Sequence, residues 1–101
     1  MLAIARPAAA QTAVKIHEIL RSPGEYSEHE VAVFGHVEGL SIGEHYATFR
    51  ICEAKCLNVL AWGHPRISEG QALSVRGRFH LFKDIDHHRV HHVIEIKHDA
   101  L

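Results

Sequence analysis

Residues 73–81 read Leu-Ser-Val-Arg-Gly-Arg-Phe-His-Leu, and apolar and polar side chains alternate along the whole stretch. This alternation predicts a β-strand with one buried face, because successive side chains of a strand point to opposite sides. The apolar face comprises Leu73, Val75, Phe79 and Leu81. Gly77 interrupts that face, and a glycine inside a strand is typical of a bulge or a sharp bend.

Four more strands are predicted on either side of this one. They cover residues 31–37, 45–52, 57–62 and 89–97, with turns at 41–44, 53–55 and 83–86. Their inward residues are Val31, Val33, Val37, Ala47, Phe49, Ile51, Leu57, Val59, Ala61, Ile94 and Ile96. Gly35 interrupts the first strand as Gly77 interrupts the fourth. Before them, Ile16, Ile19 and Leu20 share one face of a short helix that ends at Ser22-Pro23-Gly24. The pattern predicts an all-β fold, a small five-stranded antiparallel barrel with a short N-terminal helix.

The chain has 101 residues, which favours a single domain, and we place that domain at residues 14–101. Residues 1–13 are rich in alanine and show no amphipathic period, so we expect a loosely ordered segment. Residues 8–11 are similar to the end of a secretory signal, but Arg6 interrupts the short apolar stretch before them. No apolar run approaches 18 residues, so we expect no membrane span and a cytoplasmic protein.

The charge is nearly balanced overall but unevenly distributed. Lys and Arg number 11 and Asp and Glu number 12, which argues against binding duplex DNA by bulk charge alone. Residues 1–49 carry three basic and six acidic side chains, whereas residues 50–101 carry eight basic and six acidic ones. An anionic ligand should therefore prefer surfaces built from the second half. Eleven histidines make the net charge strongly dependent on pH just below neutrality.

Four segments together carry a resemblance to a known family. They are VKIHEIL (14–20), EVAVFGHVEGL (30–40), HYATFRICEAKCLNVLAWG (45–63) and ISEGQALSVRGRF (67–79). In order and spacing they resemble the OB-fold of the tRNA-anticodon and helicase type, similar to the N-terminal domain of the exonuclease VII large subunit. The resemblance covers roughly residues 15–97 and implies a non-catalytic module that binds single-stranded DNA or RNA. The chain departs from the family in its Cys52-Glu53-Ala54-Lys55-Cys56 turn and in its His-rich loop before the fifth strand.

The resemblance implies a binding face across the second and third strands, flanked by the loops between strands one and two and between strands four and five. The outward residues there would be Tyr46, Thr48, Arg50, Asn58, Leu60 and Trp62. Tyr46 and Trp62 would stack on bases. The cations that follow the backbone would be Arg50, Arg76, Arg78, Lys83 and Arg89. Two plainer interpretations stay open: Trp62 closes the barrel end, and Arg76 and Arg78 form a solvated outer face.

Histidines gather near the C-terminus, at 80, 87, 88, 91, 92 and 98. Their spacing matches no closed zinc site, so we expect titrating surface residues and no bound metal. Protonation of these histidines would strengthen contacts with phosphates, so affinity for an oligonucleotide should rise as pH falls from 7.5 to 6. Cys52 and Cys56 flank a predicted turn. A disulfide across that hairpin is one interpretation, and small apolar packing by free thiols is the favoured one.

The sequence contains no Gly-rich phosphate loop, Gly-x-Ser-x-Gly or His-Glu-x-x-His pattern, so we expect neither an enzyme nor a cofactor. Two alternatives to nucleic-acid binding stay open. The first is a protein-interaction or homodimeric module that docks through outer residues Leu60, Trp62 and Val93. The second is a barrel that binds a metal or a small ligand through the histidine cluster.

Overall fold

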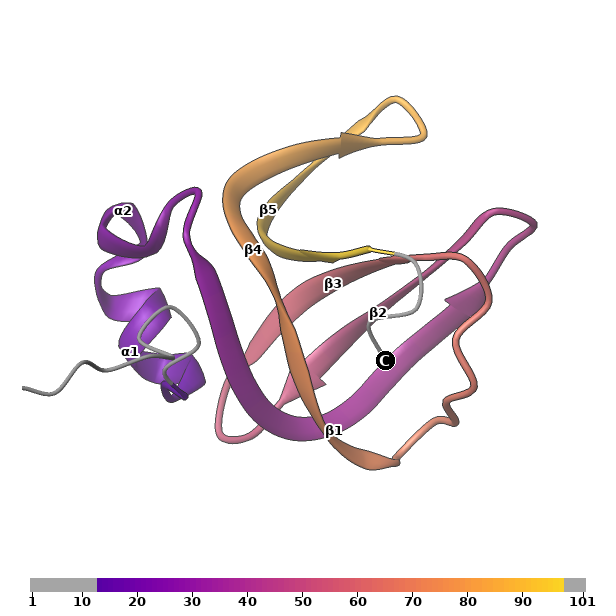
Figure 1. Cartoon of the computed structure of the whole chain (residues 1–101), viewed down its shortest axis with the longest axis horizontal. Coiled ribbons are helices and arrows are strands. Elements are labelled where there is room, and N and C mark those ends of the chain that lie inside the picture. Colours follow the sequence, from indigo (N-terminus) through magenta and orange to yellow (C-terminus); the bar gives the residue numbers. More distant parts are fainter. Residues whose placement is uncertain (1–12, 98–101) are drawn as a thin grey trace, which may run out of the picture.

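The computed structural model describes residues 13–97, which form two short helices followed by five strands (Figure 1). The elements are α1 (Ile16–Arg21), α2 (Pro23–Tyr26), β1 (Glu30–Ile42), β2 (Tyr46–Cys52), β3 (Cys56–Trp62), β4 (Ala72–Ile85) and β5 (His88–Ile96). The expectation of an all-β fold with a short helical lead-in is confirmed. The expected loose segment lies outside the described residues except for Ala13, which forms an isolated β-bridge with Ala32. Within residues 13–97, no helix has the length and apolar character needed to cross a bilayer.

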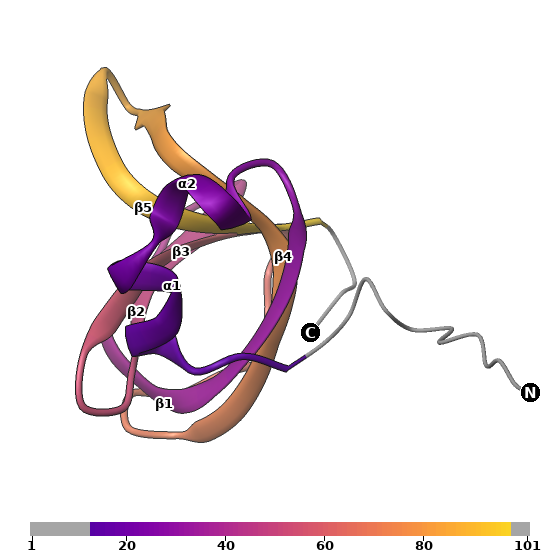
Figure 2. The same ribbon diagram turned by 90° about the vertical axis from the view of Figure 1, so that its left-hand side faces the viewer.

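The strands pair in a closed ring in the order β1-β2-β3-β5-β4, with β4 returning to β1 (Figures 1 and 2). Four of the pairs are antiparallel, but β3 and β5 run parallel. The prediction of a fully antiparallel barrel was therefore wrong. Its error is one of parity, because five strands in a ring cannot alternate in direction at every junction. One parallel pair is needed, and here it joins β3 to β5.

The inward faces predicted from alternation form the core. The buried cluster combines β-strand residues such as Phe49, Val59 and Phe79 with Ile16 and Ile19 of α1. Figure 2 shows α1 and α2 lying across one end of the strand ring. The helix therefore supplies apolar side chains where the strands leave the end of the barrel open.

Beyond the core, β4 and β5 continue as a two-stranded arm that projects from the ring (Figure 1). We call residues 81–92 the arm. Leu81, predicted to face the core, is 38% exposed because β4 has already left the barrel at this position. On β5, His92 lies opposite Leu81, between the register pairs His80–Val93 and Phe82–His91. Its backbone has a positive φ of 58°. The predicted turn at residues 83–86 is in fact strand as far as Ile85.

The arm ends in a two-residue turn at Asp86 and His87. Both residues have positive φ, 51° and 69°. Two-residue hairpin loops favour such left-handed backbone because its twist matches that of the flanking strands. Asp and His enter this region more readily than most residues. The local sequence thus lets the arm reverse tightly and remain paired to its tip.

Gly35 and Gly77 lie where a strand exchanges one neighbour for another. β1 pairs with β4 up to His36 and with β2 from His36 onward, whereas β4 pairs with β1 up to Arg78 and with β5 from there. A Cβ at Gly35 would lie 2.5 Å from the carbonyl oxygen of Cys52, and one at Gly77 would lie closer still to that of Glu95. The sequence-based assignment of these glycines to strand bends agrees with their position.

Gly77→Ala is expected to lower the free energy of unfolding by about 1–3 kcal/mol, because the added methyl group must displace the β5 backbone. The midpoint of urea denaturation measures this loss. Gly24→Ala is the matched control, since no atom lies within 4 Å of the place its methyl group would take and alanine favours the α2 helix. Equal midpoints for Gly77→Ala and the unaltered protein would contradict a close approach of β4 to β5.

Candidate functional site

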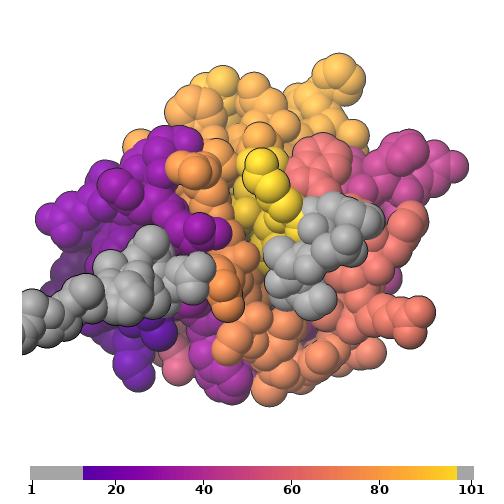
Figure 3. Space-filling model, viewed as in Figure 1, coloured from indigo at the N-terminus to yellow at the C-terminus, as the bar shows by residue number. Residues whose placement is uncertain are grey.

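A cleft of about 570 Å³ lies over the outer face of β2 and β3. Its walls are the β1–β2 turn and the arm, which project side by side at one end of the molecule (Figures 1 and 3). The lining residues are Gly39, Ser41, Gly43, Glu44, His45, Tyr46, Thr48, Phe49, Arg50, Asn58, Val59, Ile85, Asp86, His88 and Val90. The cleft therefore lies on the face where the sequence analysis placed the site.

Four predicted residues come together in this cleft: Tyr46, Thr48, Arg50 and Asn58. The hydroxyl of Tyr46 donates a hydrogen bond to the carboxylate of Asp86 and so connects β2 to the tip of the arm. This bond, with a smaller contribution from burial, raises the pKa of Tyr46 above its usual value. The amide of Asn58 donates to the carbonyl oxygen of His91 at 2.8 Å. The side chains of the strands thus hold the arm over the cleft.

Arg50 carries the positive charge of the cleft, and one carboxylate partly engages it. Its guanidinium lies 3.6 Å from Glu38 of β1, and both side chains are about half exposed. Gly39 makes room for this arrangement, because a Cβ there would lie 2.8 Å from the guanidinium. Arg50 therefore faces the cleft with an ion pair on one side and solvent on the other.

The C-terminal part of β1 is held by Glu69, which lies in the connection between β3 and β4. The register of β1 and β2 shifts between Glu38 and Ser41, a bulge that leaves the amides of Gly39 and Leu40 without strand partners. Both amides donate to the Glu69 carboxylate, at 2.9 Å each. These bonds, from Leu40 first and then Gly39, lower the pKa of Glu69. This role of Glu69 was not predicted from the sequence.

Trp62 does not line the cleft. Its ring is 39% exposed and packs edge-on against Tyr46, with 5.5 Å between ring centroids and 71° between planes. Its indole nitrogen donates to Glu95 at 2.7 Å. Tyr46 and Arg50 thus share the cleft wall as expected, while Trp62 packs against Tyr46 without lining the cleft.

Leu60 and Val93 were expected on an accessible outer face, and this prediction was wrong. They are 1% and 0% exposed. The Cα partner of Leu60 on β5 is Glu95. The Glu95 carboxylate accepts a hydrogen bond from Trp62 and pairs with Lys83 of the arm. Alternation correctly put both residues outside the core cluster, but it does not reveal whether an outward side chain is accessible to solvent.

Four of the five predicted cations lie outside the cleft lining. Arg78 donates to the carbonyl oxygen of Glu28, and Lys83 pairs with Glu95 at 3.2 Å. Arg76 is exposed on β4, whose neighbour at that position is β1. Arg89 lies on the opposite side of the arm from the lining residues His88 and Val90. Its guanidinium lies 4.2 Å from the centre of the Phe82 ring and 3.2 Å from the Asp84 carboxylate. For Arg76 the solvated-face interpretation agrees with its exposure.

The charges that line the cleft are few and mixed. Glu44 and Asp86 oppose Arg50, and the remaining ionisable cations are His45 and His88. With neutral histidines the lining carries one excess negative charge, and with both histidines protonated it carries one excess positive charge. The imidazole of His45 lies 3.8 Å from the Glu44 carboxylate. His45, His88 and Asp86 were not among the predicted site residues, although the His-rich loop was a signal for His88.

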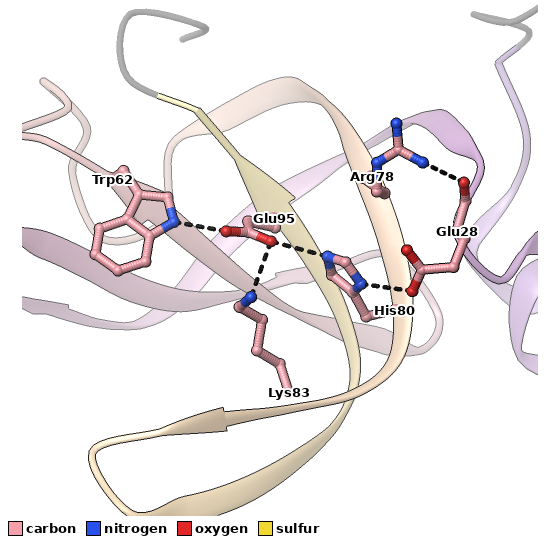
Figure 4. A network of polar contacts seen from close by, with 6 residues as sticks. All are labelled: Glu28, Trp62, Arg78, His80, Lys83 and Glu95. Carbon is pink, nitrogen blue, oxygen red and sulfur yellow. Dashed lines mark hydrogen bonds and ion pairs between the residues drawn. The ribbon is translucent and has the colours of Figure 1, made fainter.

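A polar network beside the cleft converges on Glu95 (Figure 4). Its carboxylate accepts from Trp62, lies 2.8 Å from the imidazole of His80 and pairs with Lys83. The other His80 nitrogen lies 2.8 Å from Glu28, so an imidazolium at this position would satisfy both carboxylates. The network therefore links β3, β4, β5, the arm and the segment before β1.

Cys52 and Cys56 form a disulfide, so the favoured interpretation as free packing thiols was wrong and the hairpin alternative is confirmed. They are direct partners in the β2–β3 register, with Cα atoms 4.1 Å apart. The bridge closes the 53–55 turn beyond the Arg50–Asn58 pair. Among the described histidines of the C-terminal run, none joins a group of three metal-ligating side chains.

Neither a protein-family model nor a curated protein matches this sequence. The function must therefore be argued from the geometry of the cleft and the chemistry of its side chains.

The contacts of Glu95 predict how the free energy of unfolding changes with pH. Burial pulls its pKa upward, but hydrogen bonds from Trp62, Lys83 and His80 outweigh this effect and leave the pKa below its usual value. A lowered pKa in the folded state contributes stability above the unfolded value of about 4.3, and that contribution is lost as pH falls through the folded value. Glu95→Gln should therefore lower the free energy of unfolding by about 1–2 kcal/mol at pH 7.

The unaltered protein should lose stability as pH falls from 6 to 3, and Glu95→Gln should lose less. Urea denaturation at each pH measures the free energy of unfolding of both proteins. Glu53→Gln, in the exposed hairpin turn, is the matched control and should keep the acid slope of the unaltered protein. An unchanged slope in Glu95→Gln would mean that the network does not favour the ionised carboxylate.

Proposed function

We propose that this protein is a non-catalytic OB-fold module that binds single-stranded nucleic acid in the cleft over β2 and β3. The observation that carries the proposal is the placement of Tyr46 and Arg50 together on the cleft wall. An aromatic ring offers a stacking surface to a base, and a cation beside it offers a contact to the phosphate backbone. The five-stranded ring, the helix at one end and the walls formed by the β1–β2 turn and the arm support the OB-fold resemblance.

The mixed charge of the cleft sets the expected strength of binding. A strand bound near neutral pH meets Arg50 but also Glu44 and Asp86, so binding is weak unless further cations form. Protonation of His45 and His88 supplies them. The proposal thus assigns the pH dependence expected from the histidine content to two particular side chains.

The disulfide bears on where the protein works. Disulfides persist in oxidising compartments and are rare in the cytosol. Cys52–Cys56 therefore weighs toward an oxidising compartment, against the cytoplasmic location expected from the sequence.

A protein-interaction module is the second candidate, favoured by exposed apolar side chains. Phe34 is 56% exposed, Ile42 55% and Phe82 48%. The residues first expected to dock a partner support it less, because Leu60 and Val93 are buried. This candidate requires no oligonucleotide binding and a mass above 11.3 kDa in solution, which light scattering measures.

Titration of fluorescent oligo-dT and oligo-U, followed by anisotropy, tests the main proposal. Tyr46→Ala should weaken binding by about 5- to 150-fold, the equivalent of about 1–3 kcal/mol for one base stacked on an aromatic ring. Arg50→Ala should weaken binding and reduce the salt dependence by about one phosphate contact. Arg76→Ala removes the same charge outside the cleft and should bind like the unaltered protein. Equal losses in Arg50→Ala and Arg76→Ala would contradict binding in the cleft.

The pH dependence is a separate test. Oligonucleotide affinity should rise as pH falls from 7.5 to 6, and the double variant His45→Gln/His88→Gln should flatten this rise. His64→Gln, exposed and outside the cleft, is the control and should keep it. A profile that is already flat in the unaltered protein, or still steep in the double variant, would contradict the assignment to these histidines.

A further inference from the structure

The hairpin end of β2 and β3 gathers side chains that share the chemistry of metal ligands. A carboxylate oxygen of Glu38 and the two sulfurs of Cys52 and Cys56 all lie within 4.8 Å of one another. His36 lies next to this group but not within 4.8 Å of all its ligand atoms; it is the Cα partner of Cys52, and its Nε2 lies 3.7 Å from Glu38. The four residues come from three neighbouring strands, and Glu38 and His36 stand two positions apart on β1.

We propose that Cys52, Cys56, Glu38 and His36 bind a divalent metal of the Zn²⁺ class when the disulfide is reduced. Two thiolates, one imidazole and one carboxylate are donors that zinc accepts, and four of them complete a tetrahedral site. This site is distinct from the histidine run near the C-terminus and does not depend on whether the cleft binds nucleic acid.

The metal site and the disulfide cannot exist at the same time, because both use the sulfurs of Cys52 and Cys56. A dithiol reductant transfers two electrons and two protons to the Cys52–Cys56 bond, which breaks to give two thiols while the reductant becomes a disulfide. Zn²⁺ then displaces the two thiol protons and binds two thiolates. In the oxidised form the sulfurs carry no negative charge and are bonded to each other, so that form lacks two of the four ligands.

The strand register keeps the ligands together after reduction. Cys52 and Cys56 are paired directly across the hairpin, and His36 is paired to Cys52 from the other side. Zinc–sulfur bonds of about 2.3 Å in a tetrahedron need sulfurs about 3.7 Å apart, a separation that side-chain rotation provides for residues in direct register. The backbone of the three strands can therefore stay where it is.

Glu38 must loosen its ion pair with Arg50 to join the site. It lies 3.6 Å from Arg50 and 3.7 Å from His36, and its side chain is 43% exposed. Exposed ion pairs of this kind hold weakly. The carboxylate is thus free to turn toward the two sulfurs.

Co²⁺ titration of the full chain tests the proposal, because cobalt bound to thiolates shows a sulfur-to-metal charge-transfer band that histidine sites lack. The reduced protein should bind one Co²⁺ per chain with this band and with the strong visible absorption of a tetrahedral site. Zn²⁺ should displace it, and the oxidised protein should show no such band.

Glu38→Gln and His36→Ala keep both cysteines and should weaken Co²⁺ binding to the reduced protein by about tenfold or more. The controls, Glu53→Gln and His64→Ala, alter the same residue types outside the cluster and should bind like the unaltered protein. The proposal is overturned by a reduced protein without the charge-transfer band. It is equally overturned if Glu38→Gln and His36→Ala both bind with unaltered affinity, since the two cysteines would then be acting as a simple dithiol chelator.

Discussion

The rest of this structure depends on the closure of the strand ring, which requires a glycine at the bend of β1 and another at the bend of β4. At Gly35 and Gly77 a strand passes so close to the carbonyl of a second neighbour that no side chain fits. β1 and β4 can therefore each pair with two strands in succession, and five strands suffice to close the ring. The direction of β5 follows from its antiparallel pairing with β4, and in a closed ring with an odd number of strands this leaves β3 and β5 as the parallel pair. That direction brings β5 out beside β3 and carries the arm over the cleft.

The sequence was most informative about the faces of the strands. Alternation identified inward residues such as Phe49, Val59 and Phe79, because a small barrel core selects for apolar side chains at every second position. It failed on the outer face. Leu60 and Val93 lie outside the core cluster and are still buried, and contacts such as Lys83–Glu95 beside Leu60 join residues distant in sequence. Periodicity within one strand carries no record of such contacts.

The charged residues show a similar limit. Arg76, Arg78, Lys83 and Arg89 lie in the basic half of the chain, yet ion pairs, backbone contacts and strand direction place them away from the cleft lining. A count of cations predicts the sign of a surface only when no opposite charge pairs with them. The side chains that do shape the cleft include Asp86, predicted only as part of a turn, and Glu69, for which no role was predicted. Their partners are 40 and about 30 positions away, so neither contact shows in the local sequence.

Glu38 lies where the cleft and the cysteine pair meet. Its carboxylate lies 3.6 Å from Arg50, which lines the cleft, and one carboxylate oxygen lies within 4.8 Å of the sulfurs of Cys52 and Cys56. When its carboxylate binds a metal, the cation offsets the negative charge, so the carboxylate neutralises the guanidinium less. A metal held by the reduced cysteines would therefore leave Arg50 with a freer positive charge toward the cleft. Through Glu38, the proposed metal site would couple the oxidation state of the hairpin to the charge of the cleft.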